Sequence, residues 1–346
     1  MIIFEKIIAS YNSKLPFAAY KKPNENHISG FFMKDDSLQY TESFTESGFV
    51  FAPFNDNEKA ILFPFEKSNY YTEPLVLEYS YFEENSFISD VKSKAFHVNV
   101  VQKAIDEIKN SELQKVVVSR KETIDLSDFD LVKIYKKLLK SYKNAFVSIW
   151  FHPKVGLWLG ATPETLLQMN GLSFKTMSLA GTQIYQEDKK AVWKNKELEE
   201  QQLVTDFIQN QLIAISSDLK VDNKETIKAG DLLHLRTKVE GDLHQNYTLK
   251  SLIRALHPTP AVCGLPRDMA REFILKNEKY NRSYYTGFLG ELNINQKTAL
   301  FVNLRCMQIH DNKSVIYVGG GITKDSNSEK EWEETVSKSK TMKKVL

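Results

Sequence analysis

The chain has 346 residues, of which 42% are hydrophobic and 26% charged, and its formal net charge is +2 at pH 7. This composition is typical of a globular protein, and the length is enough for one large domain or two ordinary ones. A charge so close to balance argues against a nucleic-acid partner and against an anionic membrane surface.

The cysteines and the N-terminus indicate the compartment. Cys263 and Cys306 lack metal-ligand spacing, and such sparse use of cysteine indicates free thiols in a reducing compartment. No apolar run approaches the length of a membrane span. The first ten residues are interrupted by Glu5 and Lys6 and lack the basic start of a signal peptide. We therefore expect a cytoplasmic protein that does not enter a membrane.

Residues 1–92 are rich in Phe and Tyr and contain scattered turns, and no group of residues there suggests a chemical reaction. Short apolar runs in this part predict strands at residues 48–52, 60–65 and 75–79. We therefore expect the N-terminal part of the chain to give structural support.

The sequence pattern changes near residue 93, where apolar residues at helical spacing predict a helix over residues 94–109. Residues 115–120 have the pattern of a buried strand that begins with Lys115. A lysine at a strand end is usually a solvated edge residue, so this position alone does not indicate chemistry. The same criteria predict a helix at 131–139 and strands at 145–151 and 156–160.

The segment 160–167 combines a strand break with an isolated acid. Pro163 cannot donate a backbone hydrogen bond and marks the break. Glu164 follows in otherwise apolar company, where burial would raise the pKa of its carboxyl and make it usable as a general acid near neutral pH. A proline followed by glutamate is also a common helix start. The residues alone leave both interpretations open.

Arg305 lies in apolar company within a strand predicted at residues 300–307. A buried arginine needs a partner, which is usually a carboxylate of the protein or of a ligand. The segments between Glu164 and Arg305 predict strands at 172–178 and 234–243, helices at 194–217 and 268–275, and an ordered loop at 256–264. Residues 284–290 are predicted to lead into a further strand.

A run of three glycines follows a strand predicted at residues 314–318. The glycines at 319–321 would permit positive φ angles and let the backbone approach a ligand without a Cβ in the way. Ser328 is the expected cap of the helix that follows. The spacing matches neither a dinucleotide fingerprint nor a P-loop, so we do not expect a nucleotide site.

Two predicted helices carry acidic pairs with the same spacing. Glu331, Glu334 and Lys338 share one face of the C-terminal helix, and Glu197 and Glu200 share a face of the earlier one. Two such helices could enclose one hard divalent cation between oxygen ligands. Solvated helices with surface charge pairs are the simpler interpretation, and these residues alone do not decide between the two.

Eight motifs follow one another in the chain: KVVVSR (115–120), GATPETLL (160–167), LAGT (179–182), KELEEQQLVTD (196–206), HPTPAVCG (257–264), RSYYTGFLG (282–290), LFVNLRC (300–306) and GGGITKDSNSEKEWEETVSK (319–338). Together they resemble the chorismate-utilising enzymes, which include isochorismate synthases, anthranilate synthase large subunits, aminodeoxychorismate synthases and salicylate synthases. The resemblance covers residues 95–342 and implies an α+β fold. Two large antiparallel sheets would pack face to face, with helices outside and the active-site cleft between them.

The resemblance also implies a division of the chain and a set of roles. Residues 1–92 would be the family's variable N-terminal portion, adding strands to the same fold, and residues 93–346 the catalytic region. Lys115 would be the base that activates water against C2 of chorismate, and Glu164 the acid for the departing C4 hydroxyl. The expected Mg²⁺ ligands are Glu200 and Glu334, with Glu197 and Glu331 contributing directly or through water.

Nine further residues would contact the substrate if the resemblance holds. Tyr285 and Arg305 would bind the enolpyruvyl carboxylate, and Lys338 would reach a carboxylate. His257 would orient the ring region, and a purely structural role is its alternative. The full set of expected contacts is Gly181, Thr182, His257, Ala261, Tyr285, Arg305, Gly319, Gly320 and Lys338.

Within the family, the chain is most similar to isochorismate synthases. Aminodeoxychorismate synthases carry a nucleophilic lysine where this chain has Ala180, and water-adding members have a lysine at the position of Lys115. We therefore expect chorismate as the substrate, a monomer and no obligate glutaminase subunit. The alternatives are an anthranilate- or salicylate-forming relative and a non-catalytic binding protein. The downstream use is open between menaquinone and siderophores, with menaquinone as the first choice.

Two positions depart from the family pattern. Gln201 stands where many relatives have His, and Gly320 stands where several have Ala. Because the neighbour of a metal ligand on a helix points elsewhere, we expect Gln201 to have little effect on metal binding.

Overall fold

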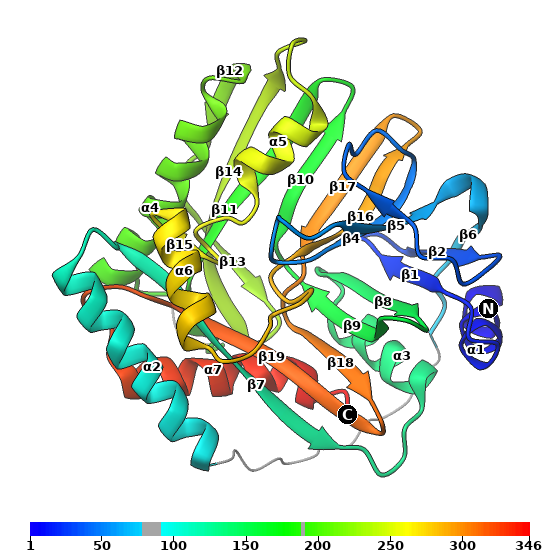
Figure 1. Cartoon of the computed structure of the whole chain (residues 1–346), viewed down its shortest axis with the longest axis horizontal. Coiled ribbons are helices and arrows are strands. Elements are labelled where there is room, and N and C mark those ends of the chain that lie inside the picture. Colours follow the sequence, from blue (N-terminus) through cyan, green and yellow to red (C-terminus); the bar gives the residue numbers. More distant parts are fainter. Residues whose placement is uncertain (78–90, 188–190) are drawn as a thin grey trace.

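The computed structural model describes residues 1–77, 91–187 and 191–346, without the side chains of residues 91 and 92. Two large antiparallel sheets pack against each other in it, and helices cover their outer surfaces (Figure 1). The α+β fold predicted from the sequence is therefore confirmed. In the described residues, no helix is both long and apolar enough to cross a membrane.

The N-terminal strands are divided between the two sheets. The nine-stranded sheet has the order β15 (Gly264–Leu265), β7 (Lys115–Asp125), β19 (Lys313–Ile322), β18 (Cys306–His310), β9 (Gly156–Thr162), β8 (Phe146–His152), β1 (Phe17–Lys21), β2 (His27–Met33) and β6 (Ser68–Pro74). The ten-stranded sheet has the order β12 (Ser216–Val221), β14 (Leu232–Leu243), β11 (Ser173–Ile184), β10 (Thr165–Asn170), β17 (Lys297–Val302), β16 (Phe288–Ile294), β4 (Gly48–Ala52), β5 (Ala60–Pro64) and β3 (Tyr40–Thr41), with β13 (Glu225–Ala229) paired to β14.

Aromatic side chains from both sheets form the core between them. Phe146 of the nine-stranded sheet stacks on Phe301 of the ten-stranded sheet, with ring centroids 4.1 Å apart. Trp150 lies between Phe51 and Phe63, at 4.8 and 5.2 Å. Because one face of each sheet meets the other sheet and the opposite face meets helices, strands such as β8 are buried along their whole length.

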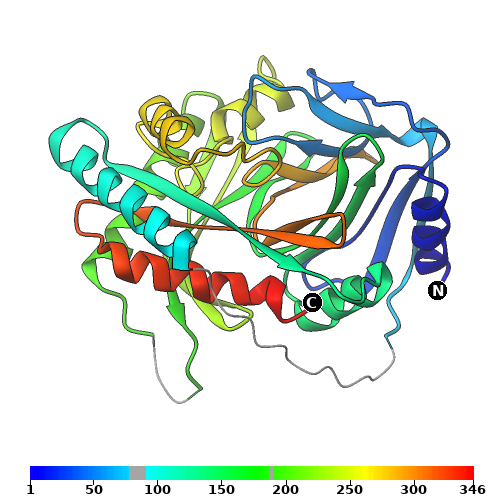
Figure 2. The same cartoon turned by 60° about the horizontal axis from the view of Figure 1, so that its bottom comes forward.

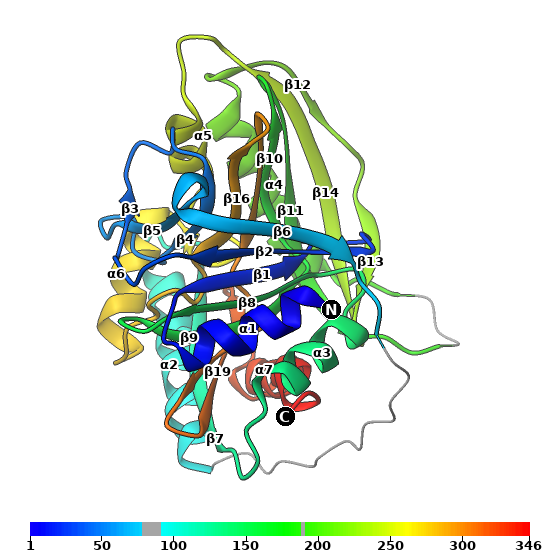
Figure 3. The same ribbon diagram turned by 90° about the vertical axis from the view of Figure 1, so that its right-hand side faces the viewer.

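Seven helices are described, and they cover three outer surfaces. α1 (Ile2–Asn12), α3 (Leu131–Ser141) and the C-terminal end of α7 (Ser328–Lys343) pack on the nine-stranded sheet, as Figure 3 shows. α4 (Asn195–Leu212) and α5 (Leu249–Leu256) pack on the ten-stranded sheet. α2 (Val91–Asn110) and α6 (Arg267–Asn277) flank β7, and α2 also packs on α7 (Figure 2). A short 3₁₀ helix covers Phe65–Lys67.

Three of the predicted elements include residues that have another structure or lie outside the described residues. Residues 75–77 continue beyond β6 without forming a strand, and residues 78–79 lie outside the described residues. The helix predicted at 194–217 ends at Leu212, because Ser216–Val221 pairs with β14 as β12. The strand predicted at 300–307 is also wrong, because the chain leaves the ten-stranded sheet after Val302 and enters the other sheet at Cys306.

The glycine run lies inside a strand and does not follow its end, as the sequence had suggested. Gly319, Gly320 and Gly321 lie inside β19, and none of the three has a positive φ. Their lack of a Cβ is nevertheless needed, because a Cβ on Gly321 would lie 2.2 Å from Oε1 of Glu200. The run therefore serves close packing and not positive φ angles.

The cap of α7 is Asn327 and not Ser328. The side chain of Asn327 accepts a hydrogen bond of 3.1 Å from the backbone N–H of Lys330, and Ser328 is already the first helical residue. The sequence prediction was wrong by one position, because Asn and Ser cap helices about equally well.

Replacing Asn327 with Ala should lower the free energy of unfolding by about 1 kcal/mol, since a backbone donor of the first turn loses its partner. Ser328→Ala is the matched control and should leave stability nearly unchanged. Urea unfolding followed by circular dichroism measures both changes. A larger loss in the Ser328 variant would contradict the assignment of the cap.

Candidate active site

A polar cavity lies where β7, β11, β14, β19, α4 and α7 meet the segments between strands. It collects most of the residues that the sequence singled out, although those residues are far apart in the chain. The lining residues with polar side chains are Glu164, Thr182, Glu200, His234, Tyr285, Thr286, Arg305, Tyr317, Glu334 and Lys338.

Lys115 begins β7 and is completely buried. Its Nζ lies 3.0 Å from Oε1 of Glu200, which lines the cavity. Although burial alone would raise the pKa of Glu200, the neighbouring Lys115 lowers it. The interpretation of Lys115 as a solvated edge residue is therefore wrong. Lys115 is not itself a lining residue, whereas its partner Glu200 is.

Glu164 is 3% exposed and lies between β9 of one sheet and β10 of the other. Its backbone carbonyl accepts a hydrogen bond of 3.0 Å from Val302, which ties it to β17. Burial raises the pKa of its carboxyl to about 8, against the opposing effects of Lys115, Lys338 and Arg305. The carboxyl is therefore protonated at neutral pH. The alternative of a helix start is wrong, because a strand follows Glu164.

Three carboxylates gather beside the glycines of β19, and each is bound by a lysine. Glu200 faces Gly321, while a Cβ on Gly320 would lie 3.4 Å from Oε2 of Glu331 and 3.6 Å from Oε1 of Glu334. The three ion pairs are Glu200–Lys115, Glu334–Lys338 at 2.7 Å and Glu331–Lys196.

Glu331 is the most deeply buried of these acids. Its side chain is 2% exposed, and its Oε2 has no hydrogen-bond partner. Burial and then the nearby Glu334 raise the pKa of Glu331, while Lys196 and, to a smaller extent, the Ser326 side chain lower it. An unpaired, buried carboxylate oxygen is costly, so this atom points to a missing cationic or donor partner.

The donor set suits a hard divalent cation, since carboxylate oxygens are the ligands that such ions prefer. The unpaired oxygen of Glu331 and the space left by Gly320 both support this fit. No group of three or more His, Cys, Asp or Glu side chains in the described part of the chain is already arranged around a common point. The carboxylates would therefore have to turn away from their lysines to share one ion.

Glu197 does not belong to the acidic group that Glu200, Glu331 and Glu334 form. Its side chain accepts a hydrogen bond of 2.9 Å from the backbone N–H of Lys194 at the start of α4. It is also absent from the lining of the cavity. Glu197 and Glu200 share a face of α4 but lie in different surroundings, because the carboxylate of Glu197 caps the N-terminus of the helix.

Arg305 and His234 form a pair in the lining of the cavity. Arg305 has a φ of +46°, an uncommon angle for a side chain of its size, and its guanidinium donates to the Ala229 carbonyl at 2.9 Å and to Nε2 of His234 at 2.5 Å. The Nδ1 of His234 lies 2.8 Å from the Gly181 carbonyl. Since burial and then Arg305 hold the pKa of His234 well below its usual value, the ring is neutral. It therefore donates from Nδ1 and accepts at Nε2.

Sequence reasoning missed His234, because one histidine in a strand carries no local signal. The expected carboxylate partner of Arg305 is not among its described hydrogen bonds, which go to a carbonyl and an imidazole. Burial lowers the pKa of Arg305 to about 10, so the cation is poorly compensated. It retains N–H groups for an anionic ligand.

The other expected substrate contacts divide into two groups. Tyr285, stacked on Tyr317 at 5.4 Å, lines the cavity, and Lys338 donates to the Gly319 carbonyl at 3.0 Å. His257 lies elsewhere: it lines a second hollow and its Nε2 is 3.2 Å from the Pro53 carbonyl. These contacts fit the structural alternative for His257. The remaining expected contacts that line the cavity are Gly181, Thr182, Ala261, Gly319 and Gly320.

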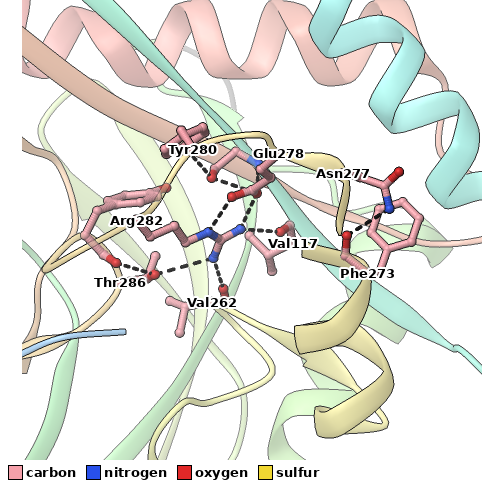
Figure 4. Close-up of polar contacts among 10 residues, drawn as sticks. Val117, Val262, Phe273, Asn277, Glu278, Tyr280, Arg282 and Thr286 are labelled. Carbon is pink, nitrogen blue, oxygen red and sulfur yellow. Dashed lines mark hydrogen bonds and ion pairs between the residues drawn. The ribbon is translucent and has the colours of Figure 1, made fainter. Parts of the chain in front are cut away.

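A buried arginine behind the cavity holds two of its walls together (Figure 4). Arg282 donates to the carbonyls of Val117 at 2.7 Å and Val262 at 2.9 Å, and it pairs with Glu278. Both Arg282 and Glu278 are 2% exposed. Because Val117 and Val262 line the cavity, this ion pair fixes β7 relative to the segment before β15.

Comparison with known proteins identifies the relatives of this chain. The model of the chorismate binding enzyme family matches residues 68–346. The chain is 32% identical over 198 residues to isochorismate synthase DhbC of Bacillus subtilis (strain 168), covering 54% of this chain and 50% of that protein. It is 30% identical over 247 residues to isochorismate synthase EntC of Escherichia coli (strain K12), covering 68% and 63%. The chain thus spans between half and two thirds of the length of these relatives.

Solved structures show the same fold. A putative 2,3-dihydroxybenzoate-specific isochorismate synthase, DhbC, from Bacillus anthracis superposes with a TM-score of 0.83 at 23% identity, covering 99% of both chains. MenF, the menaquinone-specific isochorismate synthase from Escherichia coli, gives 0.79 at 22% identity, covering 96% of this chain and 88% of that one. Since the family model matches most of the residues, the chain belongs to the chorismate binding enzyme family.

Proposed function

We propose that this protein is an isochorismate synthase, which converts chorismate to isochorismate by adding water at C2 and expelling the C4 hydroxyl. The observation that carries the proposal is the pair of Glu164 and Lys115. A protonated carboxyl lines the cavity, and a fully buried amine lies directly behind its wall. The isochorismate synthases among the relatives support the same activity.

In the proposed reaction, Lys115 removes a proton from the attacking water, which requires the neutral amine. Glu164 gives its proton to the departing hydroxyl, which leaves as water. The ring gains one hydroxyl and loses one, so the product is an isomer of the substrate. Both groups then return to their starting protonation states by exchanging protons with solvent.

The carboxylates Glu200, Glu334 and Glu331 would hold Mg²⁺ in this proposal. When bound, Mg²⁺ supplies charge neutralisation and orientation for a carboxylate of the substrate. Arg305 would bind the other carboxylate with its free N–H groups, beside Tyr285. We propose no role in metal binding for Glu197, because it caps α4.

A second candidate comes from the relatives that add ammonia. The chain is 27% identical over 271 residues to anthranilate synthase component 1 of Lactococcus lactis, covering 75% of this chain and 59% of that protein. The buried Lys115 favours water as the nucleophile.

We further propose that the protein acts in the cytoplasm as a monomer, without a glutaminase subunit. Menaquinone synthesis is the first choice for the use of its product.

The test is to incubate the full chain with chorismate and MgCl₂ and to identify the product by chromatography and mass spectrometry. We expect isochorismate, and no turnover after chelation of the metal. Formation of anthranilate with ammonium salts, or of salicylate, would contradict the proposal.

The proposed acid predicts the pH dependence of the reaction. Since the pKa of Glu164 is about 8, kcat/KM should fall about tenfold per pH unit above that value as the carboxyl loses its proton. Glu164→Gln should lower kcat by about 10²–10⁴-fold and abolish this dependence.

Stability gives a second measure of the same pKa. The carboxyl ionises near 4.5 in the unfolded chain and near 8 in the folded protein, so stability is lost as the pH rises between these values. Glu164→Gln should therefore raise Tm at pH 9 and leave it nearly unchanged at pH 4. An equal effect at both values would contradict the raised pKa.

The proposed base is tested by a pair of lysine variants in one strand. Lys115→Met should lower kcat by about 10²–10⁴-fold, because the proposed reaction loses its general base. Lys115→Arg should fail as well, since a guanidinium does not lose its proton in proteins. Lys121→Met is the control, because Lys121 is exposed on the same strand. Equal rates for the Lys115 and Lys121 variants would rule out the role of Lys115.

A further inference from the structure

Lys196 stands apart from the other two lysines of the acidic group. Lys338 also donates to the Gly319 carbonyl, and Lys115 is completely buried. Lys196 is 25% exposed, and the contact described for its ammonium is with Oε1 of Glu331. It can therefore leave its carboxylate for solvent without breaking another described hydrogen bond.

The ammonium of Lys196 acts on the whole acidic group. Burial alone would lower its pKa, but Glu331, then Glu334 and then Glu200 raise it. This order means that one positive charge lies within electrostatic reach of all three carboxylates. A divalent cation bound between them would take over the same electrostatic function.

The geometry of Glu331 makes the two cations compete. Its Oε1 is bound by Lys196, while its buried Oε2 has no partner and faces Gly320 together with Oε1 of Glu334. With no common coordination point preformed among the described side chains, a cation can gather these oxygens only if Glu331 turns. That movement breaks the contact with Lys196.

We propose that Lys196 is an internal counter-ion that a divalent cation must displace from Glu331, so that Lys196 sets the metal affinity of the site. This inference rests on the proposed function, because it takes the acidic group as the metal site. It assigns Lys196 a role outside the chemical step. The exchange keeps Glu331 neutralised in both states, which avoids leaving a buried carboxylate without a partner.

The experiment is calorimetric titration of MgCl₂ into the metal-free full chain and its Lys196→Met variant. Removing the competing ammonium should tighten the binding of Mg²⁺ by about tenfold. Metal-free Lys196→Met should also have a lower Tm than the wild type, because Glu331 loses its partner. Saturating MgCl₂ should remove most of that difference.

Lys94→Met is the matched control. Lys94 of α2 pairs at 2.7 Å with Glu329 of α7, the helix that carries Glu331, but both side chains are exposed. The control makes the same change in net charge without touching Glu331, so its affinity should equal that of the wild type.

Three results would overturn the inference. Unchanged or weaker binding in Lys196→Met would mean that the lysine supports the site and does not compete for it. Equal tightening in the Lys94 variant would reduce the effect to net charge. If the wild type binds no Mg²⁺, the metal assignment fails and the inference with it, whereas product analysis decides separately whether the proposed isomerase activity stands.

Discussion

The antiparallel pairing of β7 with β19 is the interaction on which the candidate site depends. The register sets Gly321 opposite Val117 and Gly319 opposite Ser119, so the strand that begins with Lys115 runs beside the glycines. Because these glycines lack a Cβ, the carboxylates of α4 and α7 can approach the sheet closely. Any side chain at position 321 would have to displace Glu200. The strand pairing therefore creates the space in which amine and carboxylates meet.

The other side of the site depends on two passages between the sheets. Glu164 lies where the chain passes from β9 to β10, and Arg305 lies where it passes from β17 to β18. The passages are joined by hydrogen bonds, from the Val302 N–H to the Glu164 carbonyl and from the Ala161 N–H to the Arg305 carbonyl. Glu164, the proposed acid, and the buried cation Arg305 therefore line one cavity from two neighbouring connections between the sheets. The Arg282–Glu278 pair fixes a third wall from behind.

Local patterns were enough to predict the kind of most elements and to find the acidic pairs on two helices, whereas the positions that depend on tertiary contacts were not predictable. Periodicity predicted the strand of Lys115 and the helices that carry Glu200 and Glu334, and their convergence required the resemblance to a family. The glycine run was expected to permit positive φ angles, because nothing local distinguishes such glycines from glycines kept for close packing. Glu197 is spaced from Glu200 as Glu331 is from Glu334, so its spacing fits a metal ligand. Only its position at the start of α4 shows that it caps the helix. His234 became visible only through its contacts with Arg305.

The central claim is that water attacks the ring under the control of Lys115 and Glu164. It is tested most directly by turnover of chorismate in ¹⁸O-labelled water with MgCl₂ present, followed by mass spectrometry of the product. The account predicts isochorismate that carries one solvent oxygen, located in its new hydroxyl group. An unlabelled isochorismate would contradict the account, since the hydroxyl would then have moved within the substrate and neither side chain would have the role assigned to it.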